Sequence, residues 1–395
     1  MAATRSRGGG GRILRGLLAA GKLAFDSSAA ATQMKVLFIS RAYPPVTGGI
    51  ENHNWALSQW LPGEVAVRTL ANRRGKRALP WFLPWAIIYA LWTGHRFDAV
   101  LLGDGILGVV GWCLKLLRPR LRVVAVVHGL DLSWPARWYQ RLWVRRFLPA
   151  LDGLIAVSQA TRALAEDKGI TPERLCVIPN GLDVAAFAGA ADRAALAARL
   201  GRPLDQTTVL LTTGRLVRRK GAAWFIREVL PGLPARVIYV LAGAGPDEAE
   251  IRAAVAARGL TDRVVLLGRV DDATRELLLH SADVFIQPNV PVAGDMEGFG
   301  IAVLEAGICA RPVLASALEG LLDAVADGCN GQLLPALDAA AWQRAITALM
   351  DDPAAAAALG ARAAAHVRSH HDWAAIAARY ARFLAVSPAG ANPAN

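Results

Sequence analysis

The sequence predicts an α/β protein built from two doubly wound domains, each with a parallel sheet between layers of helices. Three observations lead to this prediction. Short apolar segments recur along the chain, separated by stretches of helix length. They are apolar throughout, which is typical of strands covered by helices on both faces. The pattern starts at Met34 and starts again at Thr207, so it runs through the chain twice.

The first run forms the predicted N-terminal domain, residues 34–190. KVLFIS (35–40) has the composition of a buried strand, residues 50–61 suit a helix, and EVAVRTL (64–70) suits a second strand. Three more apolar strands follow, at residues 97–102, 121–127 and 153–157.

The second run forms the predicted C-terminal domain, residues 200–370, after a boundary in the Ala-rich stretch 184–205. Its strands are predicted at residues 207–213, 236–241, 263–267, 283–287 and 312–315. The last segment, residues 371–395, carries Trp373, Ile376, Tyr380 and Leu384 at helical spacing. We expect a closing helix that packs on the N-terminal domain, followed by a tail.

Composition limits the class of protein. With 54% hydrophobic and 19% charged residues in a chain of 395, the sequence has ample core and excludes global disorder. The four cysteines form no CxxC pair or His cluster, which argues against a disulfide framework or structural zinc and fits a reducing compartment. No apolar run reaches the ~20 residues of a membrane span. Residues 1–33, rich in Gly, Ala and Arg, are expected to be a disordered extension or the product of an upstream start codon.

Charge is uneven along the chain. Residues 34–190 hold 19 Lys and Arg against 10 Asp and Glu, whereas residues 191–395 hold 20 against 21. A basic N-terminal half predicts an anionic partner for that half. We expect no nucleic acid among the partners.

The chain is organised around GDMEGFGIAVLEAGICARPVLA (294–315), a glycine loop that opens a helix. Glu297 and Glu305 lie before and inside this helix. Carboxylates accept hydrogen bonds from hydroxyls, and helix N-termini attract phosphate. The pattern therefore suits a ligand with both groups, such as a nucleotide sugar, although two solvated glutamates on a helix face would give the same spacing.

In an open α/β sheet, ligands bind beyond the carboxyl ends of the strands, so we expect the ligand-binding residues in the loops that follow the strands. Gly48 and Gly49 follow the first strand and allow backbone N–H groups to approach a phosphate, or form an ordinary turn. His128 ends an apolar strand and is either a sugar contact or a buried core histidine.

Two more loops follow strands of the second domain. Arg215 and Lys220, in GRLVRRKG (214–221), could hold a diphosphate and stabilise a leaving group, or belong to a solvated basic loop, as we expect for Arg218 and Arg219. Gly243 and Gly245 resemble a dinucleotide-type turn, but no acidic residue follows at the spacing of such a site. We find no DxD triplet, GxSxG motif or P-loop, and expect no catalytic metal.

Together these segments resemble glycosyltransferase family 4, retaining nucleotide-sugar enzymes of the GT-B fold. The similarity covers about residues 34–385 and rests on YPPVTGGIE (43–51), VVHGLD (126–131), AVSQATR (156–162), VIPNGLD (177–183), GRLVRRKG (214–221), LAGAGP (241–246) and EGFGIAVLEA (297–306). The last is the family's Glu-x₇-Glu signature. One departure stands out: members often continue as ASxxGGxxE, whereas this chain has Glu319 before a single glycine and Asp323 in place of the glutamate.

The resemblance implies two domains facing an inter-domain cleft and a role for each candidate. Gly48 and Gly49 would lie by the donor phosphates, and His128 would contact the donor sugar. Arg215 and Lys220 would bind the diphosphate. In the second domain Glu297 would hold sugar hydroxyls and Glu305 the ribose, with backbone N–H groups offered by Phe299 and Gly300 and a further donor contact at Gly243.

The donor implied is a GDP- or UDP-sugar, used without a cofactor, and the expected product is a hexosylated envelope glycolipid or polysaccharide. Two other functions stay open. One is another GT-B enzyme, such as an NDP-sugar epimerase or a phosphorylase. The other is a non-catalytic sugar-nucleotide-binding scaffold.

Residues 134–148 (WPARWYQRLWVRRFL) interleave arginines with tryptophans, a pattern that suits a membrane interface. Trp81, Trp85 and Trp92 add to it. We therefore expect a lipid or lipid-linked acceptor and a cytoplasmic protein held at the inner face of the membrane. Alternatively, these aromatic side chains pack between helix and sheet.

Overall fold

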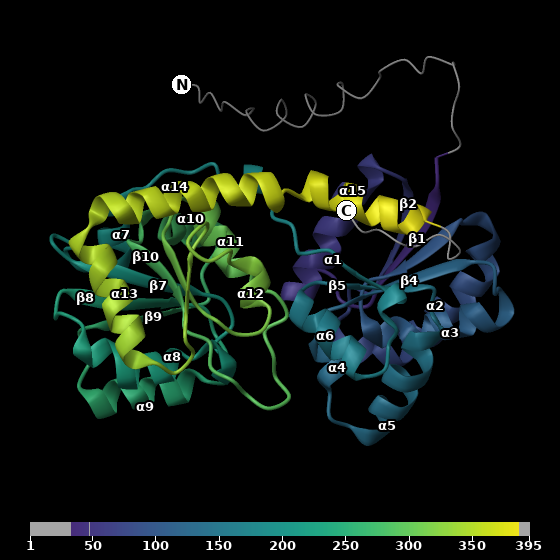
Figure 1. The fold of residues 1–395 in the computed structure, drawn as a ribbon, viewed down its shortest axis with the longest axis horizontal. Coiled ribbons are helices and arrows are strands. Elements are labelled where there is room, and N and C mark those ends of the chain that lie inside the picture. The colour runs from purple at the N-terminus through teal and green to yellow at the C-terminus, as the bar shows by residue number, and fades with distance from the viewer. Residues whose placement is uncertain (1–32, 47, 387–395) are drawn as a thin grey trace, which may run out of the picture. The chain divides into compact units, whose positions relative to one another are not determined.

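The computed structural model describes residues 33–46 and 48–386. The predicted extension, apart from Gln33, and residues 387–395 of the tail lie outside this part of the chain. Two six-stranded sheets make up the described fold, and all their paired strands are parallel. Figure 1 shows helices around each of them.

The first sheet has the order β2-β1-β3-β4-β5-β6. Its strands are β1 (Lys35–Ser40), β2 (Ala66–Ala71), β3 (Ala99–Leu102), β4 (Arg122–Val127), β5 (Gly153–Ala156) and β6 (Leu175–Val177). Its main helices are α1 (Gly49–Trp60), α2 (Leu79–Thr93), α3 (Gly108–Leu117), α4 (Leu130–Ser133), α5 (Arg137–Tyr139) and α6 (Gln159–Asp167). A π-helical segment over Gln140–Phe147 continues α5.

The second sheet has the order β12-β11-β10-β7-β8-β9. Its strands are β7 (Thr208–Thr213), β8 (Val237–Ala242), β9 (Val264–Gly268), β10 (Val284–Gln287), β11 (Val313–Ser316) and β12 (Gln332–Leu334). Its helices include α7 (Arg193–Leu200), α8 (Ala222–Trp224), α9 (Glu248–Arg258), α10 (Asp272–Ser281), α11 (Ile301–Ile308), α12 (Leu321–Ala324), α13 (Ala339–Asp351) and α14 (Pro353–His370).

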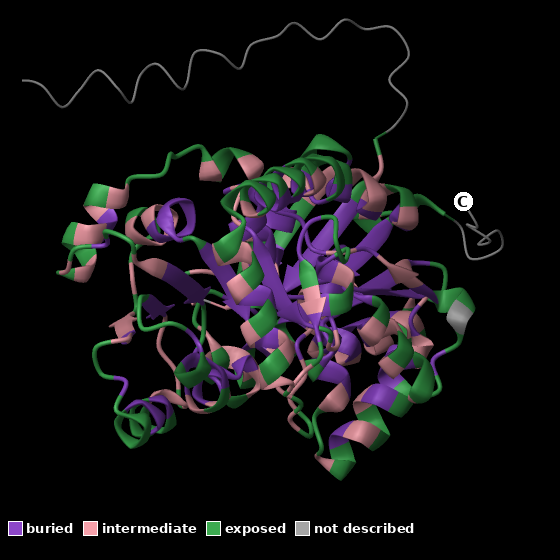
Figure 2. Ribbon diagram, turned by 60° about the vertical axis from the view of Figure 1, so that its left-hand side comes forward, coloured by how far each residue is buried: buried purple, intermediate pink, exposed green. Residues whose placement is uncertain are grey.

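The predicted doubly wound α/β fold is thus confirmed, and the apolar segments form the buried strands seen in Figure 2. The prediction missed β6 and β12. Each has only three residues, and β12 begins with the exposed Gln332, so neither gives an apolar run that stands out.

The last helix, α15 (Trp373–Ala385), buries the four apolar side chains that had suggested it. It packs on α1 and is hydrogen-bonded to β4 and β6 of the first sheet. There the Arg379 Nη2 donates to the Val177 carbonyl at 2.8 Å, and the Arg122 Nη2 donates to the Phe383 carbonyl at 2.7 Å. Figure 1 shows the chain running from α14 into α15, where it meets α1.

Two buried imidazoles sit beside α15. Burial lowers the pKa of His371 from 6.5 to about 4, although its hydrogen bond to the Asn180 carbonyl opposes the shift. Burial also lowers the pKa of His53, whose Nε2 lies 3.3 Å from the Tyr380 hydroxyl. Both rings are therefore neutral in the folded protein at pH 7.

This predicts loss of stability in mild acid. The unfolded chain takes up protons below pH 6.5 and folded His371 only near pH 4, so the free energy of unfolding should fall as pH drops between these values. Linkage gives about 2 kcal/mol for His371 between pH 7.5 and 5. Urea denaturation at the two pH values measures it. His371→Gln should make the free energy of unfolding depend less on pH. His95→Gln, which replaces an exposed ring, should leave that dependence unchanged. Equal pH dependence in both variants would contradict the assignment.

Candidate functional site

Glu297 and Glu305 belong to the segment that leaves β10 and enters α11. Gly300 caps α11 with φ 98°, a left-handed conformation that suits glycine, and a Cβ there would meet the Leu321 side chain. No described residue accepts a hydrogen bond from the N–H groups of Phe299 or Gly300, although the Phe299 ring itself is buried in the core. The local sequence thus leaves backbone donors at the start of a helix.

Glu297 is the centre of a buried ionic group and is only 7% exposed. Its Oε2 lies 2.6 Å from the Lys220 Nζ and 3.6 Å from the Arg219 Nε, and it accepts a hydrogen bond from the Asn289 amide at 3.3 Å. Burial alone would raise the pKa of Glu297, but the two cations and these hydrogen bonds outweigh burial and lower it. Glu297 is therefore a fixed negative charge.

The prediction that Arg219 is simply solvated is wrong. Its side chain is 19% exposed and pairs with Asp295 at 3.2 Å as well as with Glu297. A run of three cations does not reveal which of them points inward. Arg218 is exposed, as expected.

Arg215 lies in the same loop but differs from Lys220. Its side chain is exposed, and the described part of the chain offers its guanidinium no hydrogen bond or ion pair. The structure thus brings Lys220 and Glu297 together and leaves Arg215 available to a ligand.

Glu305 pairs with Arg275, whose Nη1 lies 2.9 Å from Oε1. Burial raises the pKa of this carboxyl, nearby Asp272 adds to the rise, and Arg275 and Lys220 oppose it. The motif of residues 297–306 did not reveal that Arg275 binds Glu305, because Arg275 belongs to α10, outside the motif.

Gly243 and Gly245 serve the packing of two loops. Gly243 has φ 158°, and a Cβ on it would overlap the Gly214 carbonyl oxygen; a Cβ on Gly245 would overlap that of Leu216. Backbone hydrogen bonds from Leu216 to Ala244 and from Asp247 to Leu216 join the same loops. The glycines thereby set the position of the loop that carries Arg215.

Gly245→Ala should therefore destabilise the protein by about 2–3 kcal/mol, because its methyl group has no space beside a backbone carbonyl. Gly63→Ala is the matched control: nothing lies within 4 Å of a Cβ there, and its change should stay within about 0.5 kcal/mol. Urea denaturation of both variants measures the difference. Equal stabilities would show that the two loops move apart readily.

His128 directly follows β4 and is buried. Its Nε2 lies 3.1 Å from the Gly103 carbonyl, and its backbone N–H donates to Asp131 at 2.9 Å. A Cβ on Gly298 would come within 2.5 Å of the His128 carbonyl oxygen. The loop of Glu297 therefore lies directly against the backbone of His128.

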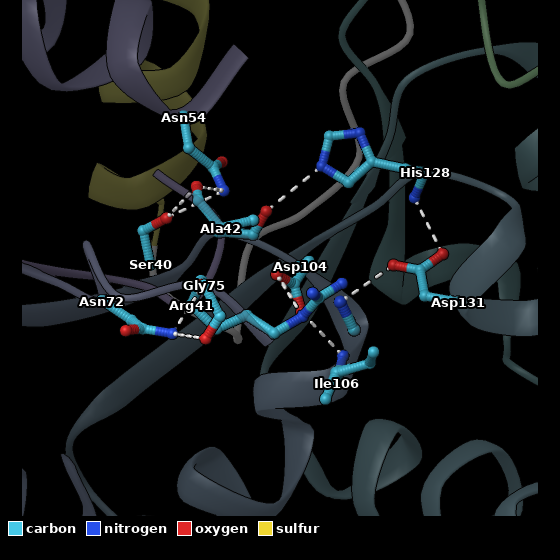
Figure 3. Close-up of polar contacts among 12 residues, drawn as sticks. Ser40, Arg41, Ala42, Asn54, Asn72, Gly75, Asp104, Ile106, His128 and Asp131 are labelled. Carbon is cyan, nitrogen blue, oxygen red and sulfur yellow. Dashed lines mark hydrogen bonds and ion pairs between the residues drawn. The ribbon is translucent and has the colours of Figure 1, made fainter. Parts of the chain in front are cut away.

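Three charged residues, Arg41, Asp104 and Asp131, lie near His128 beyond the carboxyl ends of the first sheet's strands (Figure 3). The Arg41 Nε lies 3.0 Å from the Asp104 carboxylate, and the Asp131 Oδ2 accepts from the Gly105 N–H at 2.9 Å. Burial raises the pKa of Asp131, and the nearby His128 opposes this rise. Sequence reasoning missed Arg41 and Asp104, although each comes soon after an apolar strand.

Gly48 and Gly49 stand at the start of α1. Gly49 is exposed with nothing within 4 Å of a Cβ, and a Cβ on Gly48 would meet only the flexible Glu51 side chain. The Gly48 carbonyl accepts from the Asn52 N–H. Neither glycine contacts another candidate residue in the described structure, so their role by the donor phosphates stays a prediction.

Within residues 33–46 and 48–386, no three His, Cys, Asp or Glu side chains are grouped so as to hold a metal ion. In the same part of the chain, no helix combines the length and the apolar character that a membrane span needs.

Comparison with known proteins gives two matching family models. Residues 30–186 match the model described as Glycosyltransferase Family 4, and residues 207–352 match Glycosyl transferases group 1. The GDP-mannose-dependent alpha-(1-6)-phosphatidylinositol monomannoside mannosyltransferase of Mycolicibacterium smegmatis is 32% identical over 271 residues, 67% of this chain and 70% of that protein. A D-inositol 3-phosphate glycosyltransferase of Kineococcus radiotolerans is 37% identical over 56% of this chain and 54% of its own length.

Solved structures support the fold. Anabaena HepE in complex with UDP and glucose is similar with a TM-score of 0.71 at 22% identity, covering 89% of this chain and 99% of that one. The catalytic domain of Arabidopsis thaliana Starch Synthase IV has a TM-score of 0.73 at 16% identity and covers the same shares. With its two parallel sheets, its two family models and its mannosyltransferase relative, this chain belongs to glycosyltransferase family 4 and is a glycosyltransferase of the GT-B fold.

Proposed function

We propose that this protein transfers a hexose from a nucleoside-diphosphate sugar to a hydroxyl group of a lipid or lipid-linked glycan, with retention of the anomeric configuration. The observation that carries this proposal is the buried pairing of Glu297 with the Lys220 and Arg219 cations, in the loop that also carries the exposed Arg215. Gly298, next to Glu297, lies against the His128 carbonyl. Cations that can receive a diphosphate and a carboxylate that can receive hydroxyls are thus side by side.

Each candidate has a role in the proposed reaction. Arg215 and Lys220 bind the diphosphate and stabilise the charge that grows on it as the glycosidic bond to phosphate breaks. Glu297 orients the sugar hydroxyls, and Glu305 those of the ribose. The departing phosphate oxygen accepts the proton of the acceptor hydroxyl as the new bond forms, so the protein need not supply a base. Gly48, Gly49 and Gly243 are proposed to shape the donor site.

GDP-mannose is the first donor to test, because two relatives are described as GDP-mannose-dependent. UDP-glucose is the second, since HepE was solved with it. Calorimetry with both sugar nucleotides, followed by transfer to phosphatidylinositol and to a phosphatidylinositol mannoside, would test the proposal. NMR of the product's anomeric proton reads out retention. Binding without transfer to any hydroxyl acceptor would favour a scaffold, and donor isomerisation without acceptor would favour an epimerase.

A lipid acceptor is supported by the exposed apolar side chains of one helical layer. Helices α2, α3 and α5 with the π-helical segment pack side by side on the first sheet. They carry most of the exposed large hydrophobic side chains: Trp81, Trp85, Ile88, Trp92, Leu116, Leu117, Trp138 and Leu142. Trp134, in the connection that leads into α5, is exposed as well. Trp81 is 81% exposed and Trp92 73%, so these tryptophans do not pack against the sheet.

Cations accompany this apolar layer. Arg137, Arg141 and Arg145 are exposed beside Trp134 and Trp138, an arrangement that suits anionic headgroups with aromatic side chains at the interface. Trp143 is the exception: its indole N–H donates to the Ile106 carbonyl at 2.7 Å, and it belongs to the fold. We propose that this layer binds the inner face of the cytoplasmic membrane.

Co-sedimentation with vesicles containing phosphatidylinositol tests the membrane proposal. The protein should pellet at 0.1 M salt, and Trp81→Ser with Trp92→Ser should weaken binding at least about tenfold, whereas Trp55→Ser, on an exposed tryptophan of α1, should not. Protein that stays in the supernatant at low salt, or an equal effect of Trp55→Ser, would overturn the proposal.

A further inference from the structure

We propose that Glu319 and Asp323 are positioning residues for the transfer reaction, which together hold Glu297 against the first domain. The inference rests on the proposed function and deepens it. The two carboxylates lie in residues 317–323, which follow β11, with Glu319 before α12 and Asp323 inside it. These are the two places where the chain departs from the family pattern. The role of neither follows from that pattern.

Glu319 holds the backbone of Glu297. The Glu319 Oε2 accepts a hydrogen bond from the Glu297 N–H, and the next residue, Gly320, donates its own N–H to the Glu297 carbonyl at 3.1 Å. Both backbone polar groups of Glu297 are thus bound by consecutive residues. A Cβ on Gly320 would overlap the Gly298 carbonyl, so the two loops are in direct backbone contact.

The backbone of Glu319 is itself unusual. Its φ is 52°, a left-handed conformation that costs a non-glycine residue of this kind energy, and glycine would relieve that cost. Its carboxylate also lies near those of Glu297 and Asp295; burial first, and then these two charges, raise the pKa of Glu319. Glu319 thus combines an unfavourable backbone conformation with a carboxylate that the charges of Glu297 and Asp295 repel, and it still accepts a hydrogen bond from the Glu297 N–H. This combination suggests a functional constraint.

Asp323 joins the same segment to the first domain. Both of its carboxylate oxygens lie 2.9 Å from the backbone N of Gln159, the first residue of α6. The N-cap residue of α6, Ser158, already satisfies the Thr161 N–H with its own side chain. Asp323 therefore adds a charge from another part of the fold to a helix N-terminus, where an anion is favoured.

The geometry connects these contacts to the reacting groups. Glu297 is followed by Gly298, which lies on the His128 carbonyl, and Met296 touches the site of a Cβ on Gly129. Residues 317–323 thus bind the backbone of Glu297 through Glu319 and the start of α6 through Asp323, while Gly298, next to Glu297, lies against the His128 carbonyl. Release of either carboxylate should let Glu297 move relative to His128 without removing a group that touches the donor.

Steady-state kinetics on the full chain with GDP-mannose and UDP-glucose tests this. Asp323→Ala should lower kcat about tenfold or more with donor KM changed less than about threefold, and Asp323→Glu should recover part of the loss. Asp271→Ala is the matched control, because Asp271 caps α10 through the Thr274 N–H within its own domain. It should lower the melting temperature without changing kcat.

Glu319 gives the second test. Glu319→Gly removes the unfavourable φ together with the hydrogen bond, so the melting temperature should stay or rise while kcat falls about tenfold. Glu319→Gln keeps an acceptor oxygen and should retain most of the activity. Wild-type kcat in Glu319→Gly, or equal kinetics in Asp323→Ala and Asp271→Ala, would overturn the inference.

Hydrogen exchange measures the same contacts without turnover. Asp323→Ala should speed exchange at the first amides of α6, and Glu319→Gly at the Glu297 amide; unchanged exchange in both would also overturn the inference. If the wild type neither binds nor transfers either sugar, the proposed function fails, while the exchange experiment still decides whether the contacts hold Glu297 in place.

Discussion

Replacing Lys220 by methionine should reduce kcat/KM by at least about 10²-fold and destabilise the protein by about 3 kcal/mol. The activity should fall because Lys220 is the cation that we propose to bind the diphosphate. The stability falls because the substitution leaves the buried Glu297 carboxylate without its partner at 2.6 Å. We place the destabilisation at the lower end of the range for broken buried pairs, since Arg219 at 3.6 Å and the Asn289 amide remain near the carboxylate.

A second substitution separates the two effects. Adding Glu297→Gln to Lys220→Met removes the unpaired charge and should restore much of the stability, because apolar or neutral replacements of a whole buried pair are often tolerated. Activity should stay low. Urea denaturation and transfer assays on the two single variants and the double variant form a complete cycle. Recovery of activity together with stability would mean that the pair serves only the fold.

Arg215→Ala should have the opposite profile. The exposed guanidinium has no partner among the described residues, so stability should change by less than about 0.5 kcal/mol. Because a charged donor at a diphosphate is worth much more than one in solvent, kcat/KM should fall by about 10²- to 10³-fold.

Arg218→Ala provides the control for Arg215→Ala. Arg218 is an exposed cation three residues further along the same loop, and its removal changes the net charge equally. It should leave kcat/KM within about threefold of wild type. If the two variants lose activity to the same degree, the loop acts through its overall charge, and Arg215 has no individual role.

The site shows which residues the sequence could indicate. Lys220 and Glu297 follow β7 and β10, neighbouring strands of the second sheet, and the carboxyl ends of parallel strands meet at one edge, so their proximity could be expected from position alone. His128 follows β4 of the first sheet, so its place beside Gly298 depends on how the two sheets pack. Arg219 could not be assigned in this way. It sits between two other cations, and its inward direction depends on Asp295, which is distant in sequence.

Gly243 is a second residue whose contacts the sequence did not reveal. A GxG turn after a strand suits a phosphate contact, yet the close neighbour of Gly243 is the carbonyl of Gly214 from the preceding loop. Whether a glycine admits a ligand or another stretch of backbone depends on which loop lies beside it. The tryptophans of residues 81–92 and 134–143 show this limit as well. Helical spacing predicts the direction of a side chain but not whether another part of the fold covers it, and here Trp81 and Trp92 are exposed whereas Trp143 is bound to the Ile106 carbonyl.

Local sequence was sufficient for the longer strands, the closing helix and the family, because hydrophobic periodicity and motif spacing act over a few residues, whereas the three-residue strands β6 and β12 gave no such signal. The contacts of Glu297 with Lys220 and Glu319, and of Asp323 with α6, join residues between 22 and 164 positions apart. Such contacts depend on how the loops of both sheets pack at their carboxyl edges. That packing is a property of the folded chain, since no short segment contains both partners.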